Sequence, residues 1–139
     1  MNIKRLILAI LAGWVVIFAT DYLVHELWLG ALYAATKPLW RPESDMPTYF
    51  CWLLVAQFLI VTTFVIVWAK GFAGRSIGDA VCFGLLMGVF QQTWAIILFA
   101  VMPLPAELAI KWFLAGLVQA VLLGIATFLV YKPAAPSAP

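Results

Sequence analysis

The chain has 139 residues, of which 66% are hydrophobic and only 10% are charged, and its formal net charge is +2 at pH 7. Ordinary soluble domains carry about a quarter charged residues, so this composition excludes a soluble globular domain. The positive charge is too small and too dispersed to predict binding to nucleic acid. The chain is expected to lie in a lipid bilayer, which is its first predicted partner.

Four apolar runs are long enough to cross a bilayer, which needs roughly 20 helical residues. They cover residues 6–27, 49–69, 80–102 and 106–131, and little chain remains outside them. We therefore predict an all-α integral membrane four-helix bundle. Residues 1–132 form a single four-span membrane domain in this prediction, and the low-complexity residues 133–139 form a flexible C-terminal tail.

The start of the first run could be read as a secretory signal, because Lys4 and Arg5 precede an apolar stretch. The run is longer than a typical signal core, and no clean small-x-small cleavage site follows it. We therefore predict an uncleaved membrane helix.

The distribution of basic residues predicts the orientation. Four spans put both termini on one side, and the opposite side is called the outer side below. The terminal side holds Lys4, Arg5, Lys70, Arg75 and Lys132, and the outer side holds Lys37, Arg41 and Lys111. Short cytoplasmic loops are enriched in Lys and Arg, so five against three favours cytoplasmic termini.

The connections between the runs carry local signals. The longest one, between the first two runs, contains three prolines and the apolar "PLW" segment, so we predict a linker on the membrane surface with Trp40 and Arg41 at the lipid headgroups. Ser76 and Asp79 have the spacing of a capping box that opens the third span. Glu107 suits the start of the fourth span, where Lys111 can pair with it or reach outward.

Small residues recur at four-residue spacing in the last two spans. Such spacing lets helix backbones approach closely in a membrane, where lipid gives no hydrophobic drive for association. The residues are Gly84 and Gly88 in the third span and Gly116, Ala120 and Gly124 in the fourth. Packing inside the bundle and a seam between copies both remain open.

Polar residues occupy the outer half of every span, and the inner half contains almost none. At 1.5 Å rise per residue, Asp21 lies about 9 Å below the outer boundary and His25 about 3 Å below it. The full set of predicted pocket residues is Asp21, His25, Glu26, Gln57, Gln91, Gln92 and Gln119. Polar groups facing lipid are costly, so we expect these side chains to turn inward and bond one another.

Two interpretations of this polar set remain open. It is either a clasp that holds the bundle together or an outward-facing binding pocket. Asp21 and His25, four residues apart, share a helical face with Trp14 and Trp28. Glu26, rotated by about 100°, is expected to reach the headgroups instead.

The chemistry that these residues allow is narrow. Asp21 and His25 supply two metal ligands at most, whereas a usual site needs three or four, so a metal would also require Glu26, a glutamine or a second copy. Cys51 and Cys82 begin spans at opposite faces and are expected to be separate thiols. No complete nucleophilic set accompanies His25, and we predict neither a cofactor nor an enzyme.

The stretch "DYLVHELWLGALYAATKPLWRPESDM" resembles a pattern in small four-span bacterial membrane proteins of unknown function, in which an Asp/His-bearing first helix runs into an "LY…LWRP" loop. The resemblance implies a bacterial inner membrane and a four-helix unit. It brings no activity with it and no catalytic role for Asp21, His25 or Arg41.

These observations lead to two functional hypotheses. The first is a non-enzymatic membrane subunit or accessory protein that packs against itself or a larger membrane complex, as the absence of a soluble domain and the abundant aromatic residues favour. The alternative is a transporter-like or sensor protein that binds a proton, metal or small solute at an outward-facing Asp21/His25 pocket. An enzyme acting on lipid-borne substrates is the least favoured class.

Overall fold

The computed structural model describes residues 1–133, and every element within them is helical. The elements are α1 (Ile3–Asp21), the π-helix η1 (Tyr22–Trp28), α2 (Gly30–Ala35), the 3-10 turns η2 (Lys37–Leu39) and η3 (Glu43–Asp45), α3 (Met46–Gly71), α4 (Ile77–Val101) and α5 (Ala106–Val130). Four stretches are long and apolar enough to cross a membrane, namely Ile3–Trp28, Glu43–Gly71, Ile77–Val101 and Ala106–Val130. The predicted all-α four-helix bundle is confirmed. The predicted tail lies, apart from Pro133, outside the described residues.

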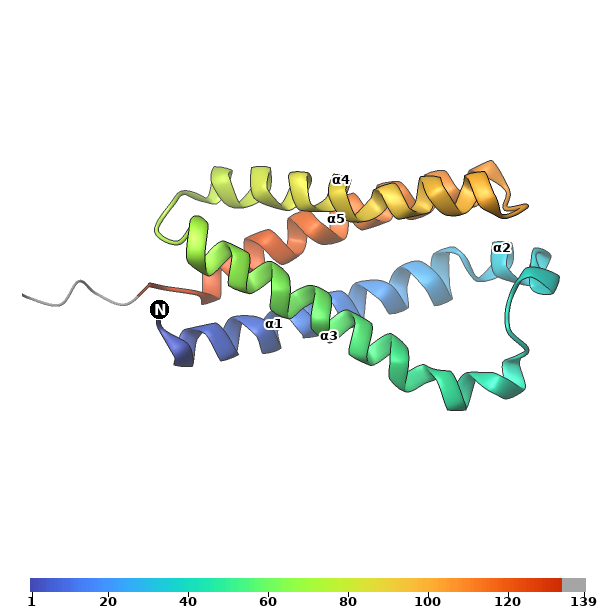
Figure 1. The fold of residues 1–139 in the computed structure, drawn as a ribbon, viewed down its shortest axis with the longest axis horizontal. Coiled ribbons are helices and arrows are strands. Elements are labelled where there is room, and N and C mark those ends of the chain that lie inside the picture. Colours follow the sequence, from blue (N-terminus) through green and yellow to red (C-terminus); the bar gives the residue numbers. More distant parts are fainter. Residues whose placement is uncertain (134–139) are drawn as a thin grey trace, which may run out of the picture.

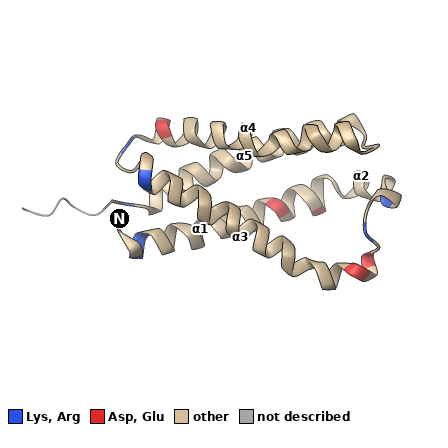
Figure 2. Cartoon of the chain, in the orientation of Figure 1, with Lys and Arg blue, Asp and Glu red and all other residues tan. Residues whose placement is uncertain are grey.

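Figure 1 shows how the helices are arranged. Helices α4 and α5 run antiparallel along their whole length, and α1 lies along α5. Helix α3 crosses α1 obliquely, so that its Met46 end diverges from the other helices. The N-terminus and the α3–α4 loop lie at one end of the bundle, called the terminal end, and α2 lies at the other, called the α2 end. Figure 2 shows that Lys and Arg gather at these two ends.

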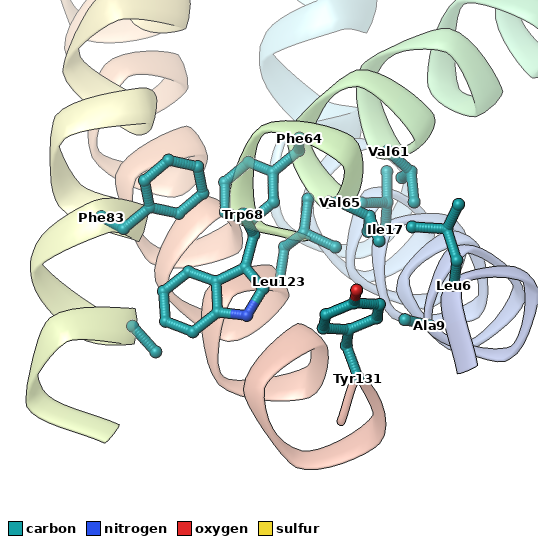
Figure 3. Packing of buried hydrophobic residues seen from close by; sticks show 11 residues of the cluster. Leu6, Ala9, Ile17, Val61, Phe64, Val65, Trp68, Phe83, Leu123 and Tyr131 are labelled. Carbon is teal, nitrogen blue, oxygen red and sulfur yellow. The ribbon is translucent and has the colours of Figure 1, made fainter. Parts of the chain in front are cut away.

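The terminal half of the bundle contains the main apolar core (Figure 3). Its buried residues are Leu6, Ala9 and Ile17 from α1; Val61, Phe64, Val65 and Trp68 from α3; Ala80 and Phe83 from α4; Leu123 from α5; and Tyr131 just after it. Trp68 is only 1% exposed, and the Phe64 and Phe83 rings meet edge to face with their centroids 4.7 Å apart. All four long helices are therefore fixed to one another in this half.

The small residues form the contact between α4 and α5. A Cβ atom added to Gly84 would lie 2.6 Å from the carbonyl oxygen of Ala120, and one added to Gly124 would lie 2.5 Å from that of Ala80. At Gly88 it would lie 3.0 Å from the Ala120 Cβ, and at Gly116 the Gln92 side chain fills the space. This stripe is occupied within the chain, as the intramolecular interpretation expects.

The long connection between the first two spans folds into short helical turns that form a cap at the α2 end, and its predicted place at the membrane surface stays a prediction. Leu29 is completely buried there against Leu104 of the α4–α5 connection and Leu108 of α5. Trp40 is half-buried, and its indole N–H donates to Thr36 Oγ1 at 2.8 Å. Arg41 is exposed and lies over the Tyr49 ring at 3.9 Å. The helical turns satisfy backbone polar groups within the connection itself, for example between Tyr33 N and Leu29 O at 3.0 Å.

The two local predictions at helix starts are confirmed. The Asp79 backbone N–H donates to Ser76 Oγ at 3.2 Å, and the Ser76 N–H donates to Asp79 Oδ2 at 3.0 Å, which completes the capping box of α4. Lys111 Nζ and Glu107 Oε1 are 2.7 Å apart at the start of α5. Cys51 and Cys82 are both free and exposed.

Replacing Ser76 by alanine is expected to lower the free energy of unfolding by about 1 kcal/mol, because the first turn of α4 then loses its capping hydroxyl. Thermal unfolding in detergent, followed by circular dichroism, measures the change. Ser44→Ala is the control, because Ser44 Oγ makes only an exposed 3.4 Å contact with its neighbour Asp45. Equal midpoints for the two variants would contradict the prediction.

Candidate functional site

A cluster of polar side chains is centred on Asp21, between the main core and the α2 end. Gln57 Nε2 of α3 donates to Asp21 Oδ2 at 2.6 Å, and Gln119 Nε2 of α5 donates to Asp21 Oδ1 at 2.6 Å. Gln119 Nε2 also lies 2.9 Å from Thr20 Oγ1, whose own proton goes to the Val16 carbonyl. One carboxylate therefore joins three helices through neutral amide donors.

Asp21 stands where α1 changes from an α-helix to the π-helix η1. The wider turn is visible in the bond from the Leu29 N–H to the Val24 carbonyl, five residues back, at 2.8 Å. His25 Nε2 lies 3.9 Å from Asp21 Oδ1, and Trp28 is 49% exposed. Asp21 and His25 thus lie on one face, as expected, although the turn between them belongs to a π-helix. Short π segments occur frequently at functional sites.

His25 continues the cluster toward the α2 end. Its Nδ1 lies 2.6 Å from the Tyr33 hydroxyl, and the Trp112 indole N–H donates to the same hydroxyl at 2.7 Å. An indole nitrogen can only donate, so the Tyr33 oxygen accepts from Trp112. Whether Tyr33 or His25 Nδ1 donates to the other depends on the histidine tautomer, and Nδ1 accepts when the histidine proton is on Nε2. In that tautomer the Nε2 proton faces Asp21.

Tyr33 is held in its protonated form. Burial raises the pKa of Tyr33 from 10.0 to about 12; the hydrogen bond from Trp112 opposes this shift, whereas the negative charges of Asp21 and Glu26 add to it. The hydroxyl can therefore donate to His25 throughout the physiological pH range.

The Tyr33 phenol is expected to ionise near pH 12 in the folded protein, against pH 10 when unfolded. A raised pKa in the folded state means that the unfolded state loses this proton first, so folding stability is complete below pH 10 and falls as pH rises to about 12. Phenolate absorbance measured against pH should contain this late step. Tyr33→Phe should lack it, and an unchanged titration in that variant would contradict the assignment.

Three predicted pocket residues are not brought to the cluster. Glu26 and Gln91 are exposed, and the Gln92 amide lies over Gly116 in the contact between α4 and α5. The expectation that every span contributes a polar group is therefore wrong for α4. The reason is local, because Gly116 has no side chain and leaves a space that the Gln92 amide fills.

Sequence reasoning missed three members of the cluster, namely Thr20, Tyr33 and Trp112. Tyr33 and Trp112 were counted only among the general aromatic content. The signal that could have found them is their polar tip, because a buried Tyr hydroxyl or Trp N–H usually needs a hydrogen-bond partner. Their pairing spans 79 residues and is not visible as a local pattern.

An apolar groove of about 350 Å³ borders the cluster between the end of the first span and α5. Leu23, Val24 and Trp28 line one side, and Thr20 and Gln119 are the polar residues on its wall. The side chains of Asp21 and His25 keep 26% and 44% of their surface exposed. The cluster is thus only partly enclosed.

The described residues contain no group of three or more His, Cys, Asp and Glu side chains that could hold a metal ion. The chain matches no protein-family model, and comparisons with curated proteins and with solved structures gave no significant match. The resemblance to small four-span bacterial membrane proteins stays a prediction.

Proposed function

We propose that the protein is a small, non-enzymatic membrane subunit or accessory protein that packs against itself or against a larger membrane complex. The observation that supports this most is the outer half of α3, residues 46–60. None of its side chains is buried, and only Leu54 and Gln57 are half-buried, whereas the following turns bury Val61, Phe64 and Trp68. A helix held at one half only offers its other half to a neighbour.

This free half is rich in large apolar side chains. Phe50, Trp52 and Phe58 are 47%, 66% and 45% exposed. Lipid can cover such a surface, and a second helix can replace the lipid when packing and polar contacts favour it. The location proposed for this role is the bacterial inner membrane, with both termini cytoplasmic. The excess of Lys and Arg on the terminal side supports this orientation.

Native mass spectrometry of the protein, extracted gently from its own membrane, tests the proposal. A subunit is expected to come out with a larger complex, or as a defined multiple of its own mass, and to stay so after detergent exchange. A single chain with no added component would contradict the proposal.

The second candidate is a binding site for a proton, metal or small solute at Asp21 and His25. The partial exposure of both side chains favours it. Neutralising Asp21 separates the two candidates, because the subunit proposal expects altered assembly and the binding proposal expects intact assembly with lost binding. An enzyme acting on lipid-borne substrates would instead require an activity that His25→Ala abolishes while the fold survives.

A further inference from the structure

The charge of Asp21 has no permanent partner within the described chain. No Lys or Arg among those residues lies within ion-pairing distance of it. The nearest basic side chain on α5, Lys111, is engaged by Glu107 at 2.7 Å and lies over the Trp28 ring. An ionisable residue at this depth in a membrane is costly and commonly marks an interaction with a partner group.

His25 is not a permanent positive partner, because it carries a charge only when both of its ring nitrogens are protonated. Among the described residues it is the only basic side chain within 4.0 Å of Asp21, with Nε2 3.9 Å from Asp21 Oδ1, and its Nδ1 lies 2.6 Å from the Tyr33 hydroxyl. When both ring nitrogens carry a proton, Nδ1 donates to the Tyr33 oxygen instead of accepting from it. The other charged group beside the site on this helix, Glu26, is negative and exposed. Helix α3 brings only the neutral Gln57.

A second polar atom at the site also lacks a partner. Gln57 Oε1 is buried without a hydrogen bond, although the same amide donates to Asp21 through Nε2. Among the described side chains, the other buried atoms without partners are Trp14 Nε1 and Thr62 Oγ1, so all three belong to the two helices that cross, α1 and α3. Gln57 Oε1 is enclosed, whereas the Asp21 carboxylate is partly exposed, so a group that carries N–H donors and a positive charge could balance Asp21 from outside.

The surroundings indicate how such a group reaches Asp21. Beyond Gln57 toward the α2 end, α3 diverges from the other helices (Figure 1), and its side chains are exposed. Two grooves of about 190 and 350 Å³ on the described chain are lined mainly by apolar side chains. In hydrocarbon, a basic side chain is delivered by a membrane helix, with its stem in lipid.

We infer that Asp21, whose side chain is 26% exposed, pairs with one lysine or arginine on a transmembrane helix of a partner protein, which docks along residues 46–60 of α3. This inference rests on the proposed subunit function and names the chemistry of the partner. The charge complementarity at Asp21 and the unpacked half of α3 select the same face.

The full-length protein in phosphatidylcholine vesicles, mixed with synthetic transmembrane peptides, provides the test. The probe is a leucine–alanine helix that carries one lysine and a dye that accepts energy from the protein's tryptophans. The lysine lies as many residues from the outer end of the peptide as Asp21 lies from Trp28. Matched peptides carry leucine or glutamate at that position, or lysine near the inner end. Energy transfer measured against the peptide-to-lipid ratio gives the relative affinities.

The outer-lysine peptide is expected to associate about tenfold more tightly than the leucine peptide, which corresponds to about 1.4 kcal/mol. Asp21→Asn should remove this preference, and Glu26→Gln, which neutralises an exposed carboxylate five residues further on, should retain it. Circular dichroism tests whether Asp21→Asn is folded. If this variant is unfolded, the affinities of the wild-type protein for the lysine, leucine and glutamate peptides decide whether Asp21 pairs with a basic side chain.

Equal affinity for the lysine and leucine peptides, or a lysine preference that survives in Asp21→Asn, would overturn the inference. Pairing between two copies of this chain that Lys111→Met abolishes would also overturn it, in favour of self-pairing. If native mass spectrometry shows a complex but the lysine and leucine peptides bind equally well, the subunit proposal is retained and only the pairing at Asp21 is rejected. If the lysine peptide binds more tightly but native mass spectrometry shows no complex, the pairing at Asp21 is supported and the subunit proposal is not.

Discussion

Alanine at Gly84 or Gly124 is expected to separate α4 from α5 and to lower the free energy of unfolding by about 3 kcal/mol. The new Cβ would lie 2.6 Å from the Ala120 carbonyl oxygen at position 84, and 2.5 Å from the Ala80 carbonyl oxygen at position 124. Both neighbours are backbone atoms, which cannot rotate away as a side chain can. Relief therefore requires the two helices to move apart along their longest contact.

Unfolding by a denaturing detergent, followed by circular dichroism, measures this loss. Gly78→Ala is the matched control in the same helix, because its Cβ would meet only Ser76 Oγ at 3.5 Å, an ordinary contact. That variant should gain slightly in stability, since alanine is a better helix former than glycine by about 1 kcal/mol. If Gly84→Ala were as stable as Gly78→Ala, the close contact between α4 and α5 would be wrong.

Gln119→Leu is expected to lower the free energy of unfolding by about 2 kcal/mol, the second-largest effect. The amide donates to the Asp21 carboxylate and contacts Thr20 Oγ1, and a hydrogen bond to a charged group is worth more than one between neutral groups. Leucine has a similar size, so the change removes polar contacts with little change in packing. Asp21 is then left with Gln57 as its amide donor.

Gln91→Leu is the control for this change, because Gln91 is an exposed glutamine on α4 outside the cluster. It should unfold at the same detergent concentration as the wild type. A double-mutant cycle with Asp21→Asn isolates the interaction between Asp21 and Gln119 from other effects of each substitution. A coupling energy of zero would show that the cluster does not hold α1 to α5.

The sequence by itself determined the fold class and two local contacts at helix starts. Four spans follow from apolar runs of bilayer length, since only closed hydrogen-bonded helices or barrels survive in hydrocarbon. The Ser76–Asp79 capping box and the Glu107–Lys111 pair are also local, because each joins residues three or four positions apart. Asp21, Gln57 and Gln119 were recognisable as polar residues that must turn away from lipid.

Only the tertiary structure decided which of these polar residues meet. Asp21 reaches Gln57 across 36 residues and Gln119 across 98, and nothing in the local pattern distinguishes Gln119 from Gln92, whose amide fills the space over Gly116. The tilt of α3, the π-helix after Asp21 and the folded cap have the same origin. These three features depend on how side chains from distant segments fit together. Hydropathy and helical period predict only which residues of each segment can be buried.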